Sequence, residues 1–357
     1  MTHQPVGDPL CAGTPGGLPT VTADVGEREW DDFVASCPSA TGYHRWCWRG
    51  VFERAFGHET IYLAARRGPG IVGVLPLVCF RSRLFGRFLV SLPFVNYGGV
   101  LASNDEARHA LVERARQEAN RRRAHHVEMR HTTRQFPRLP AKEHKVAMTL
   151  PLPAGEDAAW KGFDNKVRNQ VRKAQKSGLE AVVGGRELLD EFYAVFARNM
   201  RDLGTPVYSW RLFEEVLQNV PDALACVVRL GGTPVAAGIA VGYRDSIENP
   251  WASSLREHRA LCPNMLLYWT MIGEAIRRGY RVFDFGRSTP NEGTYHFKKQ
   301  WGAVESPFYW EYVLTRGETL PDQSRENPKF SLAVSAWQRL PLAVANLIGP
   351  RIVCNIP

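Results

Sequence analysis

One feature of the sequence limits its fold more than any other: an internal resemblance between the two halves. Residues 118–130, EANRRRAHHVEMR, align without a gap with residues 274–286, EAIRRGYRVFDFG, and each segment is typical of a helix followed by a strand. The alignment places Glu128 over Asp284. In both halves a glycine-containing hairpin pattern precedes this segment. The order hairpin, helix, strand therefore occurs twice, and we predict two related α/β units side by side.

The expected boundaries follow from the same patterns. Residues 1–24 are rich in Gly, Pro and Thr and predict a disordered tail. We expect the first unit over 25–150, the second over 151–320, and a C-terminal helical extension over 321–357. Helices are expected at 46–55, 106–123, 157–177, 187–203 and 263–278, and strands at 127–130, 246–254 and 282–286.

Composition restricts the class of protein. The chain is 44% hydrophobic and 23% charged, which is typical of a soluble globular protein, and no apolar run is long enough to span a membrane. The N-terminal residues lack the pattern of a signal peptide, and the seven cysteines form no C-x-x-C pair, so we expect a cytoplasmic protein with reduced thiols. The net charge of +9 favours anionic partners, although a solvated basic surface explains it equally well.

Several well-known active-site motifs are absent from the sequence. It contains no P-loop, no H-E-x-x-H and no Cys/His spacing for zinc, so we expect no metal. The D-F-G at 284–286 lacks the H-R-D and V-A-I-K motifs that a kinase needs, and a hairpin turn explains the glycines of 68–73.

The segment 283–302, FDFGRSTPNEGTYHFKKQWG, concentrates the polar side chains that best fit a site. Asp284 stands near the carboxyl end of a strand, where α/β sheets bind ligands, although it could equally pair with Arg287 or cap a turn. If the segment after Gly293 is helical, its aromatic residues can anchor it while Lys298 points into a cleft and stabilises an oxyanion or a phosphate. Two exposed lysines without a role remain the alternative.

Two further patches are candidates for substrate binding. Basic residues follow one side of the helix expected over 157–177 and could contact phosphates, as a nucleotide-sugar or tRNA backbone would require; they include Arg168, Arg172 and Lys173. A solvated helix face explains the same stripe. In the segment P-F-V-N-Y-G-G, Asn96 and Tyr97 precede paired glycines that suit close approach of a ligand, or simply a tight turn.

Three motifs together resemble the FemAB family. They are R-N-Q-V-R-K-A-Q-K-S-G-L-E, N-M-R-D-L-G-T-P-V-Y-S and D-F-G-R-S-T-x(3)-G-T-Y-H-F-K-K-Q-W-G-A, and the branch associated with exosortase/PEP-CTERM systems and exopolysaccharide clusters is the most similar. The resemblance covers roughly residues 30 to 314. It implies two tandem acetyltransferase-like (GNAT) domains with mixed sheets, in agreement with the duplication.

The same resemblance implies an activity. Characterised FemAB relatives transfer amino acids from aminoacyl-tRNA to amines of peptidoglycan precursors, and related GNAT-like proteins use acyl-CoA. A lysine that matches Lys298, within the pair Phe297-Lys298, assists the reaction in Fem transferases. The loop before Pro263 departs from the Q/R-x-x-G-x-G/A pattern of acetyl-CoA enzymes, which leaves the donor open among acyl-CoA, other thioesters and aminoacyl-tRNA.

We therefore expect a cytoplasmic acyl- or aminoacyltransferase that acts on an amine or hydroxyl of a cell-envelope or exopolysaccharide precursor. Lys298, Asp284 and Tyr295 are the expected catalytic residues. The expected substrate-binding residues are Asn96, Tyr97, Arg168, Arg172, Lys173, Arg287 and Phe297. No cofactor is expected to stay bound, because the donor substrate is already activated, and weak contact with the inner face of the membrane is compatible with the apolar C-terminus. The competing interpretation is a non-catalytic module that binds a glycan or nucleotide-sugar.

Overall fold

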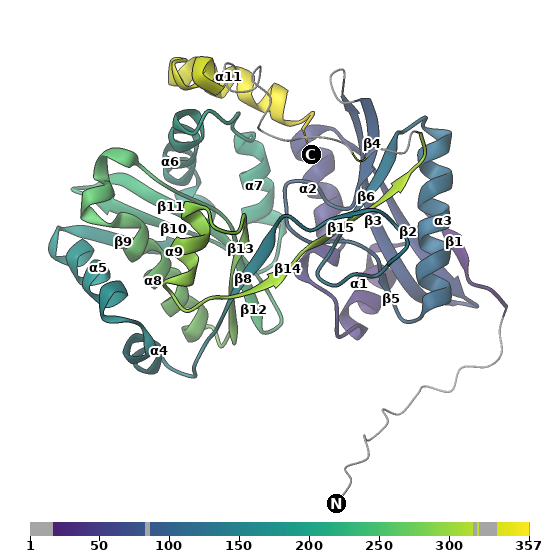
Figure 1. The fold of residues 1–357 in the computed structure, drawn as a ribbon, viewed down its shortest axis with the longest axis horizontal. Coiled ribbons are helices and arrows are strands. Elements are labelled where there is room, and N and C mark those ends of the chain that lie inside the picture. Colours follow the sequence, from purple (N-terminus) through teal and green to yellow (C-terminus); the bar gives the residue numbers. More distant parts are fainter. Residues whose placement is uncertain (1–16, 83–85, 317–319, 321–333, 357) are drawn as a thin grey trace, which may run out of the picture.

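The structure, a computed structural model, describes residues 17–82, 86–316, 320 and 334–356. These residues form two α/β units that lie side by side, each built around one mixed sheet (Figure 1).

The first sheet has the strand order β1 (Thr20–Thr22), β2 (Glu59–Arg67), β3 (Gly70–Ser82), β4 (Gly86–Val90), β6 (His126–His131), β15 (Tyr309–Leu314) and β7 (Ala141–Lys142), and β5 (Leu101–Ala102) pairs with β3. The helices of this unit are α1 (Glu27–Ser36), α2 (Cys47–Phe56) and α3 (Asp105–Arg121), with a 3-10 turn, η1, at Gly42–His44.

The second sheet has the order β9 (Leu179–Gly184), β10 (Ala223–Leu230), β11 (Thr233–Tyr243), β12 (Ser246–Ser254), β13 (Val282–Ser288), β8 (Val146–Pro151) and β14 (Val304–Pro307). Its helices are α4 (Glu156–Gly162), α5 (Asn165–Lys176), α6 (Leu189–Asp202), α7 (Trp210–Asn219), α8 (Pro263–Arg277) and α9 (Gly293–Lys299), with 3-10 turns η2 (Arg186–Leu188) and η3 (Arg256–Leu261).

The two sheets share one topology. Each has an antiparallel β-meander followed by a parallel pair, β4 with β6 in the first sheet and β12 with β13 in the second. In the parallel pairs, Glu128 stands opposite Val90 and Asp284 stands opposite Glu248. Glu128 and Asp284 therefore occupy equivalent positions, and the predicted duplication is confirmed in the order and register of the strands.

The boundaries between the units differ from those predicted. Strand β8 lies almost entirely in the range predicted for the first unit but pairs with β13 in the second sheet. Conversely, β15 lies in the range predicted for the second unit but pairs with β6 in the first sheet. The two units therefore exchange strands: β8 comes from the end of the first unit and completes the second sheet beside β13, and β15 comes from the end of the second unit and completes the first sheet beside β6. At the N-terminus, Thr20–Thr22 pairs with β2, so the fold begins before Val25; residues 1–16 of the expected tail lie outside the described residues.

The long helix predicted over 157–177 is in fact two helices. Phe163 adopts an extended conformation between α4 and α5, and its ring packs edge-on against Trp301 at 5.1 Å between centroids. Phe163 is buried, as the apolar periodicity of a continuous helix would require. The backbone nevertheless leaves the helix at Phe163, and this turn brings its side chain into the core.

A continuous apolar core joins the units. One buried cluster contains Trp48 and Phe94 from the first unit together with Phe213 and Trp251 from the second. At the rim, the guanidinium of Arg244 donates to the backbone carbonyl of Ala35 at 2.7 Å, at the C-terminal end of α1, where a cation is favourable. The units are therefore held as one body by packing as well as by the exchanged strands.

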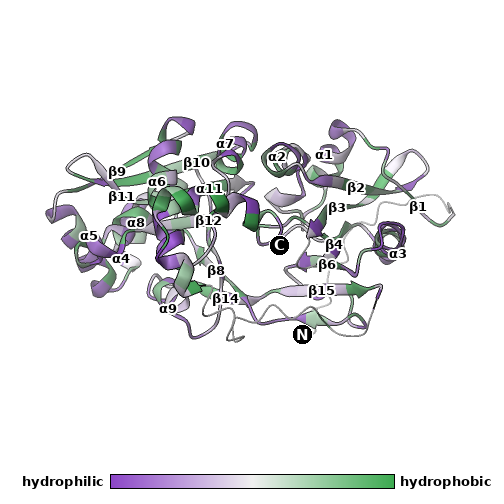
Figure 2. Cartoon of the chain, turned by 90° about the horizontal axis from the view of Figure 1, so that it is seen from above, coloured by the Kyte–Doolittle hydropathy of each residue, from purple (hydrophilic) through white to green (hydrophobic). Residues whose placement is uncertain are grey.

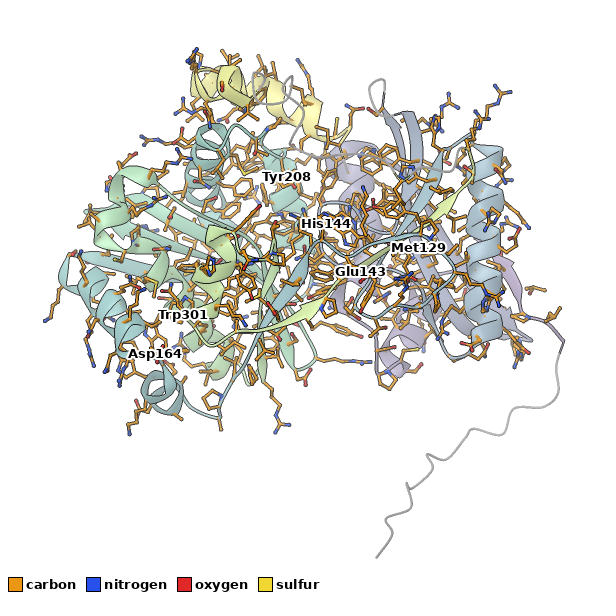
Figure 3. All side chains as sticks on the ribbon, viewed as in Figure 1. Met129, Glu143, His144, Asp164, Tyr208 and Trp301 are labelled. Atoms are coloured by element: carbon orange, nitrogen blue, oxygen red, sulfur yellow. The ribbon has the colours of Figure 1, made fainter. Side chains whose placement is uncertain are left out.

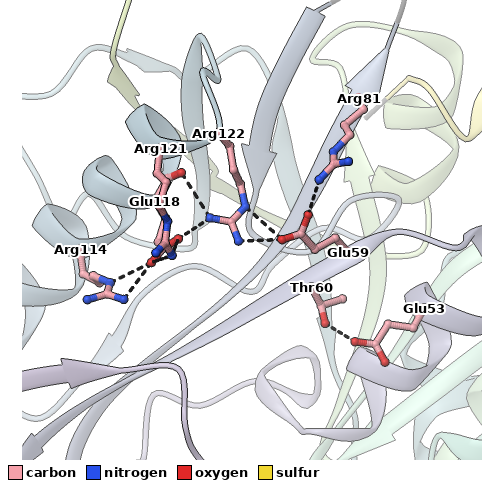
Figure 4. A network of polar contacts seen from close by, with 8 residues as sticks. All are labelled: Glu53, Glu59, Thr60, Arg81, Arg114, Glu118, Arg121 and Arg122. Atoms are coloured by element: carbon pink, nitrogen blue, oxygen red, sulfur yellow. Dashed lines mark hydrogen bonds and ion pairs between the residues drawn. The ribbon is translucent and has the colours of Figure 1, made fainter.

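Many surface arginines are paired with carboxylates. Figure 4 shows Glu118 of α3 between Arg114, Arg121 and Arg122, and Arg122 continues to Glu59, which also binds Arg81. Each of these four arginines has a carboxylate partner, although the two glutamates balance only two of the four positive charges.

The C-terminal segment packs on the second unit. Residues 334–338 are helical, and α11 (Leu342–Val353) lies against α6, with Gly349 close to Val207. Arg201 of α6 donates to the carbonyl of Leu340 at 3.0 Å. In Figure 2, α11 is largely coloured as hydrophobic, in contrast to α3. Within the described part of the chain, no helix is both long and apolar enough to cross a bilayer.

Candidate active site between the two units

Two carboxylates lie side by side where the parallel strands of the second sheet separate. Glu248 of β12 and Asp284 of β13 are the last paired positions of these strands, and paired residues of neighbouring strands point to the same face. Both residues are buried, with exposed fractions of 7% and 5%. The sheet thus brings two acids together in an environment that disfavours charge.

Gly286 turns the chain just after Asp284. The register of β13 with β8 shifts between Asp284 and Arg287, and Gly286 has a φ of 71°, in the left-handed region that side chains disfavour. A Cβ atom there would lie 3.0 Å from the side-chain nitrogen of Asn96. Only glycine fits this bend, which lets the backbone N–H of Gly286 donate to the Asp284 carboxylate at 2.7 Å.

The first unit supplies hydrogen-bond donors to both acids. Residues 91–99 connect β4 toward β5 and are held against β6, because Ser91 donates to the carbonyl of Glu128 at 2.8 Å and Gly99 to that of Arg130 at 3.0 Å. From this loop the Tyr97 hydroxyl donates to Asp284 and the Asn96 side-chain amide donates to Glu248. Each acid of the second unit is therefore positioned by a residue of the first.

The surroundings act differently on the pKa values of the two carboxyls. Burial raises the pKa of Glu248 well above its usual value, and the neighbouring charge of Asp284 raises it further. Burial also raises the pKa of Asp284, but hydrogen bonds from Tyr97 and Gly286 and the positive charge of Lys298 oppose the increase. At neutral pH we therefore expect Glu248 to hold a proton and Asp284 to be the ionised member of the pair.

Lys298 is a buried cation beside this pair. Only 7% of it is exposed, and its ammonium donates to the carbonyls of Gly286 at 3.2 Å and Arg287 at 2.9 Å. Burial lowers the pKa of Lys298 to about 8, against the attraction of Asp284 and Glu248. An ammonium group has three N–H donors, so one is left for a ligand. The neighbouring Lys299 is exposed, so the alternative of two exposed lysines is wrong for Lys298.

A cavity of about 250 Å³ opens onto the acid pair between the two units. Its walls come from both units: Pro38, Ala40, Thr41, Gly42, Tyr43, Tyr97 and Thr132 from the first, and Val241, Tyr243, Arg244, Asp245, Ser246, Glu248 and Asp284 from the second. Burial raises the pKa of Tyr43 well above its usual value, and the nearby charges of Glu248 and Asp284 raise it further. The cavity lining thus combines the acid pair with two further charged side chains, Arg244 and Asp245.

The equivalent position in the first unit is closed. There Glu128 is paired with the buried Arg130 at 2.8 Å and accepts a hydrogen bond from Tyr312 at 2.9 Å. Although burial acts in the opposite direction, Arg130 holds the pKa of Glu128 below its usual value. The loop over 91–99 also occupies the space beside β6. The first unit therefore has neither an accessible acid nor room for a substrate at this position.

Other predicted site residues lie elsewhere. The Tyr295 hydroxyl donates to Glu305 of β14, on the exposed side of α9, so it does not reach the acid pair. Phe297 packs against Tyr268 with 5.1 Å between ring centroids and anchors α9. Arg287 is exposed, and its guanidinium lies 5.5 Å from the centre of the Trp310 ring.

The basic stripe is not part of the cavity. Arg168, Arg172 and Lys173 lie on α5, at the outer end of the second unit, whereas β13 and β8 lie at its junction with the first (Figure 1). Another basic residue of the helix predicted over 157–177, Lys161, lies on the separate helix α4. Arg172 packs over the ring of Trp160 at 5.3 Å.

Sequence analysis missed Glu248 and Tyr43. A signal for Glu248 existed, since it is a single acid between Ile247 and Asn249 in a strand that was correctly predicted over 246–254. That Glu248 and Asp284 are neighbours follows only from the pairing of β12 with β13, which the sequence does not show. Among the described residues, no group of three or more His, Cys, Asp and Glu side chains could hold a metal ion.

Comparisons with known proteins support this description of the fold. Residues 161–299, within the second unit, match the family model described as an acetyltransferase (GNAT) domain. The crystal structure of FemX is similar over 82% of this chain and 97% of its own, with 17% identity and a TM-score of 0.59. A tandem GNAT protein from the clavulanic acid biosynthesis pathway is similar over 84% of this chain and 99% of its own, with 11% identity and a TM-score of 0.52. The chain has a tandem GNAT fold.

A third solved structure is L-PGS from Bacillus licheniformis. It is similar over 92% of this chain and 99% of its own, with 11% identity and a TM-score of 0.53. No curated protein matches the chain in sequence. At these identities the likeness establishes the fold, and the activity has to be argued from the site.

Proposed function

We propose that this protein transfers an acyl or aminoacyl group to an amine or hydroxyl of a cell-envelope or exopolysaccharide precursor in the cavity between its two units. One observation carries the proposal: the buried acids Glu248 and Asp284 line a cavity between the units, and the buried ammonium of Lys298 is bonded to the backbone just after Asp284. This set provides a base for the acceptor and a cation for the developing oxyanion.

In the proposed reaction, the acceptor nitrogen or oxygen forms a bond to the carbonyl carbon of the donor while Asp284 takes the acceptor proton. The carbonyl π electrons move to the oxygen, and the third N–H of Lys298 stabilises that negative charge. When the intermediate collapses, the bond to the thiol or ribose oxygen of the donor breaks, and the proton on Asp284 passes to this leaving group. Glu248 stays neutral throughout, which prevents a second negative charge from opposing the oxyanion.

The tandem GNAT fold is compatible with more than one donor. Acyl-CoA, an acyl carrier protein and aminoacyl-tRNA all present an activated carbonyl, and the catalytic groups described here require nothing more of the donor. If the donor is an aminoacyl-tRNA, Arg168, Arg172 and Lys173 of α5 would contact its phosphate backbone outside the cavity. The envelope or exopolysaccharide acceptor, and the exosortase/PEP-CTERM association, rest on the sequence resemblance.

A screen with matched variants tests the proposal. Charged tRNAs and acyl-CoAs are incubated with lipid-linked sugar and peptide acceptors, and products are identified by mass spectrometry. Wild type should form an acylated product, whereas Asp284→Asn should lose nearly all of it and Tyr295→Phe should not. A non-catalytic glycan-binding module would retain a glycan on purification and form no acylated product with any donor, and that outcome would refute the proposal.

The proposed site of action is the cytoplasm, with weak contact at the inner face of the membrane. On the outer side of α11, Leu347 is 63% exposed and Val344 is 40% exposed, and Arg351 lies in the last turn. One arginine near an anionic surface contributes about 1 kcal/mol, so binding would be weak and sensitive to salt. A protein truncated after Asn327 should lose co-sedimentation with anionic liposomes; equal co-sedimentation, with earlier melting of the truncated protein, would make the segment purely structural.

A further inference from the structure

A second set of charged side chains surrounds Trp310, next to the proposed catalytic residues. Trp310 lies on β15, the strand that the first sheet receives from the end of the second unit. The guanidinium of Arg130 lies 4.5 Å from the centre of its ring, and that of Arg287 lies 5.5 Å from it. The ring of His144 packs edge-on at 5.6 Å. In Figure 3, His144 and Tyr208 are labelled in the region where the two units meet.

Several cations gather around His144 in this cluster. Burial lowers the pKa of His144, and the charges of Lys145, Lys142 and Arg287 lower it further, which places three cations around one imidazole. Lys142 stands opposite Trp310 in the strand register, and the Lys145 ammonium donates to the hydroxyl of Thr289 on the segment after β13. The neighbouring Glu143 is already paired with Arg134 at 2.6 Å.

Arg130 and Arg287 differ in how their charges are used. Arg130 is buried and committed to Glu128, and it also donates to the carbonyl of Val95 at 2.8 Å. Arg287 is exposed and has no carboxylate within 4.0 Å among the described residues, in contrast to the arginines of Figure 4. Burial raises the pKa of Tyr208, and the positive charges of Arg287 and Arg130 oppose this increase.

We propose that Arg287, supported by Lys145 and the Tyr208 hydroxyl, binds a phosphate group of one of the two substrates. A carboxylate carries one negative charge, whereas a diphosphate or phosphate monoester carries more and matches several cations. The planar guanidinium of Arg287, held against Trp310, presents two parallel N–H donors to such a group. This inference rests on the proposed function, because it assigns part of a substrate to the same active site.

The location fits this role. Arg287 follows Asp284 by three positions on the same strand, and its carbonyl accepts a hydrogen bond from Lys298 at 2.9 Å. The backbone of Arg287 therefore adjoins the catalytic base and the oxyanion donor, and its guanidinium extends from there to Trp310. The first unit contributes Trp310, His144 and Lys145, so this subsite, like the acid pair, needs both units.

Titration calorimetry with inorganic diphosphate tests the subsite on the full-length protein. Arg287→Gln should weaken binding by roughly tenfold to a hundredfold, as expected for loss of a charge-assisted contact, and Arg287→Lys should fall between it and wild type. Arg28→Gln, which removes an exposed arginine on α1, serves as the matched control and should bind like wild type. Diphosphate that does not bind wild type, or binds Arg287→Gln as tightly, overturns the assignment.

Two competition experiments identify the source of the phosphate. Coenzyme A represents a nucleotide-containing donor, and a nucleoside-diphosphate sugar represents a diphosphate-linked acceptor. The one that displaces diphosphate from wild type and binds Arg287→Gln more weakly is the source; displacement by neither would contradict a substrate subsite.

Failure of the proposed function can be distinguished from failure of the subsite. Asp284→Asn should retain diphosphate binding although it cannot take the acceptor proton. If no donor and acceptor pair reacts but binding still depends on Arg287, the subsite stands and the transferase proposal fails. If transfer occurs and Arg287→Gln changes neither diphosphate affinity nor the KM of either substrate, the subsite fails alone.

Discussion

The hydrogen bond from Tyr97 to Asp284 should set the lower pH limit of activity. Both residues are buried, and the bond joins the first unit to the proposed base of the second. Because the hydroxyl donates to the ionised carboxylate, it lowers the pKa of Asp284. Tyr97→Phe keeps the ring and removes the donor, so the Asp284 pKa should rise and the base should become protonated at higher pH.

The size of this shift follows from the type of bond. A hydrogen bond to a charged group contributes about 1.5–3 kcal/mol, and each pH unit corresponds to about 1.4 kcal/mol. The acid limb of the profile of kcat/KM against pH, which reports the free enzyme, should therefore move upward by about 1–2 pH units. At pH values below the new limb, the variant should be slower than wild type by roughly tenfold to a hundredfold.

The chain offers a matched control. Tyr295→Phe removes the same hydroxyl from a tyrosine that donates to Glu305 instead of the acid pair, so its acid limb should coincide with that of wild type. The reasoning is refuted if Tyr97→Phe retains the wild-type acid limb, or if both variants shift equally.

Two further predictions concern Lys298. Because the pKa of Lys298 is about 8, the basic limb of the profile of kcat/KM against pH should lie near pH 8. Lys298→Ala should lose that limb, and its kcat should fall on the order of a hundredfold. The kcat of Lys299→Ala should stay within a factor of about two of wild type. Equal turnover of wild type and Lys298→Ala would exclude the oxyanion role. The free energy of unfolding should also depend on pH. Because folding lowers the pKa of Lys298 from 10.5 to about 8, the unfolded chain binds more protons than the folded chain between these two pH values. As the pH rises from 8 to 10.5, the free energy of unfolding of wild type should therefore increase by about 3 kcal/mol relative to that of Lys298→Met. Urea unfolding at several pH values, with Lys299→Met as control, measures this difference, and parallel stability curves for wild type and Lys298→Met would contradict it.

The stability prediction corrects an expectation from the sequence. Adjacent lysines on a short helix suggest exposed side chains that contribute little to folding, and this holds for Lys299. Lys298 is buried instead, because Phe297 packs against Tyr268 and fixes the orientation of α9. The sequence pattern predicted a Lys298 that points into a cleft; the structure buries Lys298, although it is not among the residues that line the cavity.

Local patterns predicted much of the fold and less of the site. Helix α8 and strand β12 were predicted almost to the residue, and α8 in particular begins at Pro263 and is followed by Gly279. The exchange of β8 and β15 could not be predicted, because an apolar strand has the same pattern in either sheet. The break at Phe163 was hidden for a similar reason: the residue is buried, as in a continuous helix, and only its tertiary contact with Trp301 requires the turn.

Long-range contacts explain the rest of the site. Asn96 and Tyr97 stood out in sequence, but as residues for a ligand or a tight turn, because nothing local shows that they face acids of the other unit. Glu248 depends on the same kind of contact, since its pKa is raised by burial and by a neighbour on another strand.

The duplication explains why one chain has one proposed site. In the first unit, Arg130 occupies the position of Gly286 and neutralises Glu128, and the loop over 91–99 fills the adjacent space. That same loop carries Asn96 and Tyr97 to the acids of the second unit. Replacing Arg130 by glycine would not restore a second site, because it would leave Glu128 buried without its cation, at a cost of several kcal/mol. The first unit has therefore become a structural part of the second unit's site, and the exchanged strands keep the two in fixed register.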